Sequence, residues 1–311
     1  MFFGTPEFAV PTLARLLAGK HPVVGVVSQP DRRRGRGRKT SPSPVASHAL
    51  AAGVPLFRPE KVGTREVAET LAATLPDLGV VVAFGQFLPK RIRELPSLGY
   101  LINGHASLLP RHRGAAPIAH ALLAGDEETG VSVMRVEREM DAGPVALERR
   151  TKIGPDEDCG GLTERISLLT AEAIDEGLDR IAEDRVAWAE QDPTHATLAP
   201  KIERRDARLD WSEDASALVQ RIRAMAPRPG AFSEWNGEPL RILAARVEAG
   251  AGAEAPGTVV IVEKEPRIAT GKGWLCPLLL QRPGGKVLAV NEFQRGRGLE
   301  SSTRLGEEAS G

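Results

Sequence analysis

The sequence predicts an α/β protein: a Rossmann-like domain with a mostly parallel, doubly wound sheet, followed by a smaller OB-like β-barrel. The first observation is that runs of β-branched apolar residues alternate with amphipathic helical stretches, as in βαβ units. The second is that beyond residue 240 the chain offers only short strands set apart by glycines. A length of 311 residues suits two domains. We therefore expect a first domain over residues 1–190, a linker over 191–207 and a barrel over 208–311.

The elements of the first domain follow from apolar periodicity and from turn residues. The first strand ends at Phe3 and is shorter than the roughly five or six residues of an average strand, so we expect either that it begins upstream of Met1 or that it is an unusually short strand. Thr5 is placed to cap the next helix, with Pro6 at the first helical position. Further strands are expected at residues 21–28, 78–84, 130–136 and 145–153, and helices at residues 8–17, 45–52, 65–74, 117–123 and 162–182.

The second domain begins after the proline-containing stretch near residues 191–205. Trp211 and a helix over residues 215–225 open it. Five short strands follow, at residues 240–245, 258–262, 267–270, 274–280 and 286–291. This succession predicts the barrel.

Composition restricts the kind of protein. Lys plus Arg equals Asp plus Glu at 41 each, and no run of about 18 apolar residues is present, so we expect no transmembrane helix. The N-terminal stretch lacks the basic start and long apolar region of a secretory signal, so we expect a cytoplasmic protein. Cys159 and Cys276 are expected to be free thiols. No group of His, Cys and carboxylates has metal-ligand spacing, so we expect no metal.

One local stretch departs from this neutrality. Between Arg32 and Lys39, six of eight residues are cations and the other two are glycines. Such a dense run cannot lie in a core and is explained equally well by a solvated loop. Its functional interpretation is an arm that binds a polyanion, because each neutralised phosphate releases counterions.

A second distinctive stretch begins with Asn103 and His105. It follows an apolar run, so both residues are expected where a buried strand ends, and residues i and i+2 share one face of a strand. They can therefore point into the same small volume. The alternative is that Asn103 caps a turn and His105 is a satisfied core histidine. No GxGxxG motif follows any strand, so a dinucleotide cofactor is poorly supported.

Several motifs together resemble one family, along nearly the whole chain. They are Gly4-Thr5-Pro6-Glu7-Phe8-Ala9, Gln29-Pro30-Asp31, Ser41-Pro42-Ser43-Pro44-Val45, Val82-Ala83-Phe84-Gly85, Asn103-x-His105-x-Ser107-Leu108-Leu109-Pro110, Arg113-Gly114-Ala115-Ala116-Pro117-Ile118, Gly130-Val131-Ser132 and Met140-Asp141-Ala142-Gly143. In these motifs the chain resembles the methionyl-tRNA formyltransferases, a family of folate-dependent formyltransferases. The Asn, His and Asp set with Ser-Leu-Leu-Pro is common to the folate-dependent enzymes. The start, the basic loop and the second domain resemble the tRNA enzymes in particular.

The resemblance implies a reaction and a catalytic set. A formyl group would move from 10-formyltetrahydrofolate, a co-substrate, to the α-amine of methionine on initiator tRNA. Asn103 and His105 could donate hydrogen bonds to the developing oxyanion. Asp141 could accept the proton of the attacking amine, directly or through a water, and a protonated His105 could return one to the folate nitrogen. Asp141 could equally act by orienting His105, and both roles remain open.

The resemblance also implies ligand-binding residues, and it makes the first domain the folate-binding catalytic domain and the second a tRNA-binding domain. We expect a monomer. Folate is expected to bind between two loops and against their apolar side chains. The expected folate-binding residues are Phe84, Gly85, Phe87, Leu88, Ser107, Leu108, Leu109 and Pro110. Initiator tRNA is expected at the basic loop, with the set Arg32, Arg33, Arg34, Arg36, Arg38 and Lys39.

Two alternatives remain. A formyltransferase that acts on a small amine would share the catalytic set but would not need the cationic loop or the barrel. A non-catalytic RNA-binding protein would use the loop and the barrel, but it would leave the polar residues at the strand ends unexplained.

Overall fold

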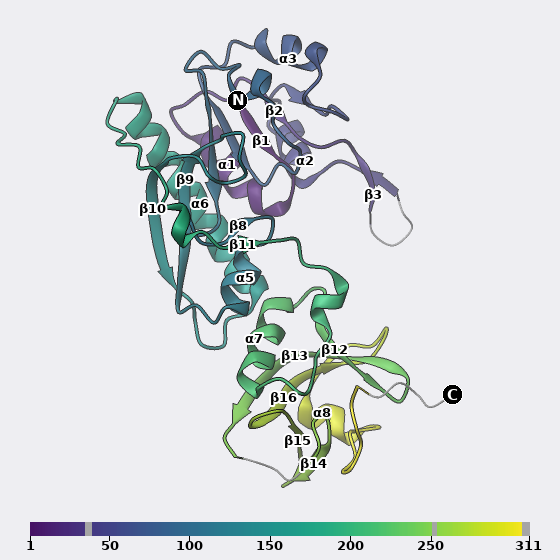
Figure 1. Ribbon diagram of the computed structural model, residues 1–311. Helices are drawn as coiled ribbons and strands as arrows, with labels where there is room; N and C mark the ends of the chain where they lie inside the picture. The colour runs from purple at the N-terminus through teal and green to yellow at the C-terminus, as the bar shows by residue number, and fades with distance from the viewer. Residues whose placement is uncertain (35–38, 251–253, 307–311) are drawn as a thin grey trace. The chain divides into compact units, whose positions relative to one another are not determined.

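The computed structural model describes residues 1–34, 39–250 and 254–306 (Figure 1). Contacts divide the chain into two compact units. The first comprises Met1–Pro117, Glu128–Lys152 and Thr163–Pro200, and the second comprises Ile118–Glu127, Ile153–Leu162 and Lys201–Gly311. Of the segment expected to be a linker, residues 191–200 therefore group with the first unit. Among the described residues, no helix is long and apolar enough to cross a membrane.

The first unit is built on a seven-stranded sheet in the order β10-β9-β7-β6-β1-β2-β5. Its strands are β1 (Phe2–Gly4), β2 (Val26–Val27), β5 (Leu56–Phe57), β6 (Gly79–Val82), β7 (Leu101–His105), β9 (Glu128–Arg135) and β10 (Val145–Lys152). The five strands from β5 to β7 in this order are parallel, whereas β9 is antiparallel to both of its neighbours. The strand order reverses at β1, and ligands of such sheets bind at the carboxyl ends of the strands near this point.

Helices cover both faces of this sheet. On one face lies the long helix α6 (Cys159–Ala182), so close that a Cβ at Gly177 would come within 3.2 Å of Val133 on β9. On the other face, Phe3, Val81 and Leu101 share a buried apolar cluster with residues of α3 (Arg65–Ala72) and α4 (Lys90–Arg93). The remaining helices of this part are η1 (Glu7–Ala9), α1 (Val10–Ala18), α2 (Pro44–Ala51) and η2 (Pro193–His195). The doubly wound arrangement predicted from the sequence is confirmed.

The second unit is an antiparallel sheet in the order β12-β13-β16-β15-β14, with β17 paired to β16. Its strands are β12 (Ala231–Trp235), β13 (Glu238–Glu248), β14 (Val259–Val262), β15 (Glu265–Ala269), β16 (Trp274–Gln281) and β17 (Val287–Ala289). Two register shifts in β13 bend it, as bulges do in small, partly open barrels. Leu218 and Ile222 of α7 (Ala215–Met225) are fully buried, as are Ile242 and Leu275 of the sheet. The predicted smaller β domain is confirmed.

Two local predictions are wrong, and two elements were missed. Thr5 does not cap a helix; its hydroxyl donates to the carbonyl oxygen of Phe84, and η1 starts after Pro6 without a side-chain cap. The strand expected over residues 21–28 pairs only at Val26 and Val27, because Phe2 and Phe3 are the β1 residues that face it. The strand β12 was missed. So was α8 (Val290–Arg295), which begins where the last strand was expected to continue.

The two ends of the basic loop pair with each other as the strands of a hairpin, which projects from the sheet (Figure 1). Strand β3 (Arg32–Arg34) pairs antiparallel with β4 (Lys39–Ser41). Sequence patterns gave no sign of these strands, since a run of arginines shows no alternation of apolar and polar residues. Arg36 and Arg38, which belong to the expected tRNA-binding set, lie outside the described residues.

Candidate active site

Strand β7 presents Asn103 and His105 on one face. Between them, Gly104 faces α6, where a Cβ would lie 2.7 Å from Thr170 Cγ2. Since side chains alternate along a strand, Asn103 and His105 point away from α6, on the same face as the buried Leu101. The sequence prediction that these two side chains share a face at a strand end is thus met by the structure.

His105 is held in a fixed orientation. Its side chain is only 6% exposed, and Nε2 lies 3.0 Å from the carbonyl oxygen of His112. A carbonyl oxygen can only accept, so Nε2 carries the proton of that hydrogen bond. Nδ1 faces the carboxylate of Asp141, with 3.6 Å between Nδ1 and Oδ2. That separation is too long for a direct hydrogen bond but brings the two groups into one site.

Asp141 reaches His105 from the loop between β9 and β10. Its Oδ2 accepts a hydrogen bond of 2.8 Å from the backbone N–H of Gly114. The backbone of Asp141 is left-handed, with φ of 52°, a region in which Asp is found more often than most residues. Among the described residues Oδ1 has no hydrogen-bond partner, so one carboxylate oxygen is fixed and the other is available.

Gly114 is the residue that permits this contact. It lies on β8 (Arg113–Gly114), which pairs in parallel with β11 (Leu198–Ala199). Its φ is 129°, and a Cβ there would come within 2.5 Å of the carbonyl oxygen of Ala199. Only glycine can adopt this conformation and approach so closely. The N–H that holds Asp141 therefore depends on a glycine at this position.

The carboxamide of Asn103 is half-buried and has no hydrogen-bond partner within the described parts of the chain. Partly buried amides usually find partners. Two N–H donors thus remain available beside His105, which is what recognition of a carbonyl oxygen requires. The three residues predicted to be catalytic therefore come from one strand face and one facing loop.

Four of the predicted folate-binding residues follow β6, and they differ in solvent exposure. Gly85 is exposed and Phe87 presents 69% of its surface, whereas Phe84 and Leu88 are buried at 2% and 6%. Phe84 and Leu88 belong to the apolar cluster of the sheet. Only the first two are therefore placed to touch a ligand, and the other two support them.

Gln29 fixes the turn that carries these residues. Its Nε2 donates to the carbonyl oxygens of Phe84 and Gly85, at 3.1 and 3.0 Å. Its Oε1 accepts from Arg32 at the base of the basic hairpin, at 2.9 Å. One amide thus connects the turn after β6 with the hairpin.

The Ser107–Pro110 turn is held by its own polar groups. The Ser107 hydroxyl donates to the carbonyl oxygen of Arg111, and the Leu109 N–H donates to the Ser132 hydroxyl, which in turn donates to the Ser107 carbonyl oxygen. Ser107 and Leu109 are buried, whereas Leu108 and Pro110 are half-buried. The first two therefore shape the turn, and the other two can line a ligand surface.

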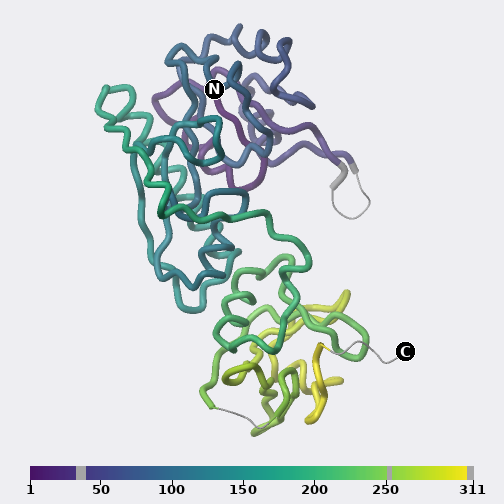
Figure 2. Tube along the Cα trace, viewed as in Figure 1, coloured from purple at the N-terminus to yellow at the C-terminus, as the bar shows by residue number. Residues whose placement is uncertain are grey.

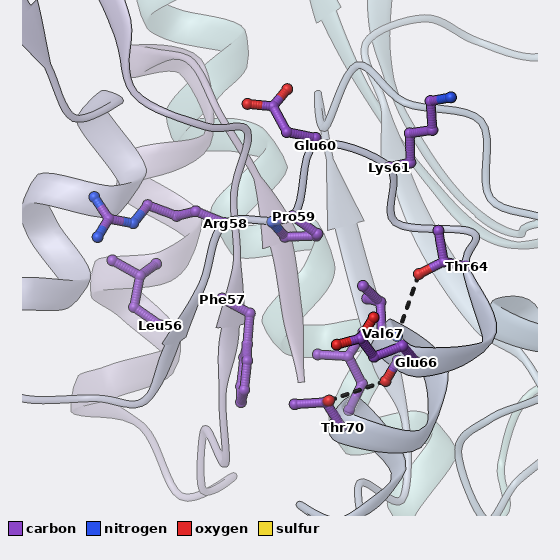
Figure 3. A pocket seen from close by; sticks show the side chains of 11 residues that line it. Leu56, Phe57, Arg58, Pro59, Glu60, Lys61, Thr64, Glu66, Val67 and Thr70 are labelled. Atoms are coloured by element: carbon purple, nitrogen blue, oxygen red, sulfur yellow. Dashed lines mark hydrogen bonds between the residues drawn. The ribbon is translucent and has the colours of Figure 1, made fainter.

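A separate pocket of about 600 Å³ lies between β5 and α3 (Figure 3). Phe57, Val67 and Leu71 are among its apolar residues, and Arg58, Glu60 and Lys61 are among its polar residues. None of the predicted site residues lines it. Among the described residues, no group of three or more His, Cys, Asp or Glu could hold a metal ion.

Sequence patterns missed Gln191, which contacts the loop of Asp141. Its Nε2 lies 2.9 Å from the carbonyl oxygen of Asp141 and 2.7 Å from that of Gly143. Gln191 falls in the stretch expected to be a linker. No spacing rule connects a glutamine with backbone groups 50 and 48 positions earlier, so only the fold could reveal it.

Comparisons with known proteins show the family of the chain. A model of the family "Formyl transferase" matches residues 1–178, and one described as "Formyl transferase, C-terminal domain" matches residues 201–298. The methionyl-tRNA formyltransferase of Methylococcus capsulatus is 45% identical over 306 residues, covering 98% of this chain and 99% of that protein.

Two solved structures are similar in fold. One is an N-formyltransferase from Helicobacter canadensis in complex with folinic acid and dTDP-3-aminofucose, with a TM-score of 0.64 and 13% identity. The match covers 89% of this chain and 97% of that protein. The other is HypX from Aquifex aeolicus in complex with tetrahydrofolic acid, with a TM-score of 0.54 and 18% identity. The match covers 82% of this chain and 45% of HypX. With both domain models matched and a relative aligned along its full length, the chain belongs to the formyl transferase family.

Proposed function

We propose that this protein transfers the formyl group of 10-formyltetrahydrofolate to the α-amine of methionyl initiator tRNA, giving formylmethionyl-tRNA for translation initiation. The observation that carries the proposal is the arrangement of Asn103, His105 and Asp141 at the carboxyl end of β7. Relatives named methionyl-tRNA formyltransferase, 40–45% identical over nearly the whole chain, support the choice of acceptor. A role in translation supports a cytoplasmic location, and we propose that the enzyme acts as a monomer.

Asn103 is proposed to stabilise the charge that develops on the formyl oxygen. When the amine attacks the formyl carbon, that oxygen becomes negative, and preorganised N–H donors then strengthen their hydrogen bonds. The Asn103 carboxamide has both N–H donors uncommitted within the described structure and lies on a rigid central strand. It can meet the charge without rearrangement of the fold.

His105 and Asp141 are proposed to handle the protons. The attacking amine must lose a proton, and the folate nitrogen must gain one as it leaves. Because Nε2 of His105 is tied to the His112 carbonyl oxygen, Nδ1 is the nitrogen that can exchange a proton. Asp141 faces Nδ1 with Oδ2 and keeps Oδ1 available for the amine or a water. This pair can therefore act as base toward the amine and as acid toward the leaving nitrogen.

Folate is proposed to lie across the carboxyl ends of β6 and β7, which are neighbours in the sheet. Exposed Gly85 and Phe87 offer a backbone edge and an apolar ring, and half-buried Leu108 and Pro110 offer an opposing wall. Ligand sites combine such apolar walls with a few polar backbone groups. The residues present thus fit the pterin ring of the folate, and N10, the nitrogen outside that ring that carries the formyl group, would lie toward Asn103.

The basic hairpin is proposed to bind the acceptor end of the tRNA, with the second domain contributing further tRNA contacts. Replacing Arg33, Arg34, Arg36 and Arg38 together by Ala should weaken tRNA binding and make it less sensitive to salt, by about 0.7 to 0.9 in log–log slope for each lost phosphate contact. Arg32 is left in place because it contacts Gln29. Binding titrations at several salt concentrations give the slope, and folate affinity serves as the control. An unchanged slope would remove the hairpin from the tRNA site.

A panel of acceptors tests the function itself. The enzyme and 10-formyltetrahydrofolate are incubated with charged initiator tRNA, charged elongator methionine tRNA, free methionine and an amino-sugar nucleotide. We expect rapid formylation of the initiator tRNA alone. Preferred formylation of the amino-sugar nucleotide would support the small-amine alternative. Binding of tRNA without formylation of any acceptor would favour an RNA-binding protein.

A further inference from the structure

The chain that follows α6 returns along the first unit and contacts both loops of the candidate site (Figure 2). The Thr197 hydroxyl accepts a hydrogen bond from the backbone N–H of His112, and the carbonyl oxygen of His112 holds His105. Gln191 is bonded to the backbone of the loop that carries Asp141. Gln191 and Thr197 therefore belong to the structure that shapes the site.

All the hydrogen-bonding capacity of the Gln191 amide is used. Nε2 donates to the carbonyl oxygens of Asp141 and Gly143, at 2.9 and 2.7 Å. Oε1 accepts from Nε and Nη2 of Arg113, at 3.1 and 2.8 Å. Carbonyl oxygens can only accept and a guanidinium can only donate, so just one orientation of the amide satisfies all four contacts.

Arg113 makes this arrangement rigid. It is only 7% exposed, and its Nη1 lies 3.6 Å from the carboxylate of Glu139, in the same loop as Asp141. Its backbone belongs to β8, next to the glycine that donates to Asp141. Gln191 thus holds the backbone of the Asp141 loop, and Arg113 holds Gln191 and faces Glu139 of that loop. The Gly114 N–H holds the Asp141 carboxylate.

The left-handed backbone of Asp141 explains why such support is needed. A non-glycine residue in this conformation persists only when its surroundings hold it. The two carbonyl oxygens that Gln191 binds belong to Asp141 itself and to the second residue after it. Without these bonds the loop could relax, and the carboxylate would move relative to Nδ1 of His105.

We propose that Gln191 is a positioning residue that fixes the backbone of residues 141–143 and so keeps the Asp141 carboxylate facing His105. The inference rests on the catalytic role proposed for Asp141. Gln191 touches backbone groups and Arg113 and need not touch substrate. Its effect on the reaction is therefore transmitted through Asp141.

The variant Gln191→Glu tests this idea because it keeps the size of the side chain. The carboxylate can still accept from Arg113, but it has no N–H for the two carbonyl oxygens and places a negative oxygen against them. We expect kcat to fall by about 10- to 100-fold, the cost of a small misplacement of a catalytic group, with KM for both substrates within about 3-fold. If Gln191→Glu does not fold, Gln191→Asn takes its place in the test. The shorter amide of Asn cannot reach both carbonyl oxygens, so we expect the same loss of kcat.

Gln294→Glu is the matched control. Gln294 also binds backbone groups with both ends of its amide, since it donates to the carbonyl oxygen of Leu299 and accepts from the Leu299 N–H, but it lies in the second domain. The same chemical change there should leave kcat within about 2-fold, in the range of ordinary single substitutions away from a site. Thermal unfolding of both variants shows whether they are equally folded.

The Asp141→Ala background separates positioning from a general structural role. There, adding Gln191→Glu should change kcat by less than about 3-fold, because the group that Gln191 positions is gone. An equal loss in both backgrounds, or wild-type kcat in Gln191→Glu, would overturn the inference. Failure of the catalytic role itself is seen separately, as near-normal turnover in the single variant Asp141→Ala.

Discussion

His105→Ala is expected to lower the rate of formyl transfer by about 10²- to 10⁴-fold, the usual contribution of a positioned proton-transfer group. The imidazole is buried, its Nε2 is fixed by the His112 carbonyl oxygen, and its Nδ1 faces Asp141 at 3.6 Å. Removal leaves no group in its place to return a proton to the folate nitrogen. The measurement is the single-turnover rate with enzyme in excess over charged initiator tRNA, so that product release does not contribute.

The control for this prediction is His195→Ala. His195 also faces a carboxylate, with 3.5 Å between its Nδ1 and Asp192 Oδ2, but its side chain is 75% exposed. The same imidazole–carboxylate pair therefore exists outside the site. We expect His195→Ala to keep the wild-type rate. If a folded His105→Ala protein also keeps it, proton transfer does not pass through this imidazole.

Asn103→Ala is expected to lower kcat by about 10²- to 10³-fold, equivalent to about 2.7–4 kcal/mol of lost transition-state stabilisation. KM for both substrates should change little, because the hydrogen bond strengthens only as the oxyanion develops. The carboxamide has no partner among the described residues, so its removal breaks no hydrogen bond of the fold. Steady-state kinetics with both substrates varied gives kcat and KM separately.

Two further variants sharpen this prediction. Asn103→Asp keeps the size of the side chain but replaces the NH2 group, which carries both N–H donors, with one oxygen, so it should be at least as slow as Asn103→Ala. Asn291→Ala serves as control, since the Asn291 side chain, in the second domain, accepts only from the neighbouring N–H of Glu292 among the described residues. A loss confined to KM would show that Asn103 binds the ground state and does not stabilise the transition state.

The part of the site carried by one strand could be predicted from the sequence. The apolar run before Asn103 indicated a buried strand, and the alternation of side chains placed Asn103 and His105 on one face. Asp141 was different, because it lies 36 positions beyond His105 in a loop with other carboxylates. Only resemblance to a family singled it out, and the fold then brought it within 3.6 Å of the imidazole.

What the sequence could not predict depends on contacts between distant backbone groups. The segment 191–200 has two prolines, as linkers often do, yet β11 pairs with β8 and Gln191 binds the Asp141 loop. Such contacts leave no periodic pattern in the chain. Strand β2 was predicted too long for a related reason, since local β propensity could not reveal that only two residues of β1 face it.

The most direct test of the central claim, that these side chains act as one site, is a double-mutant cycle between His105 and Asp141. Single-turnover formylation of charged initiator tRNA is measured for the wild type, His105→Ala, Asp141→Ala and the double variant, with folding checked by thermal unfolding. Because both residues serve one proton path, the double variant should be no more than about 3-fold slower than the slower single variant. Rate losses that simply multiply in the double variant would show that the two residues act independently, contrary to this account.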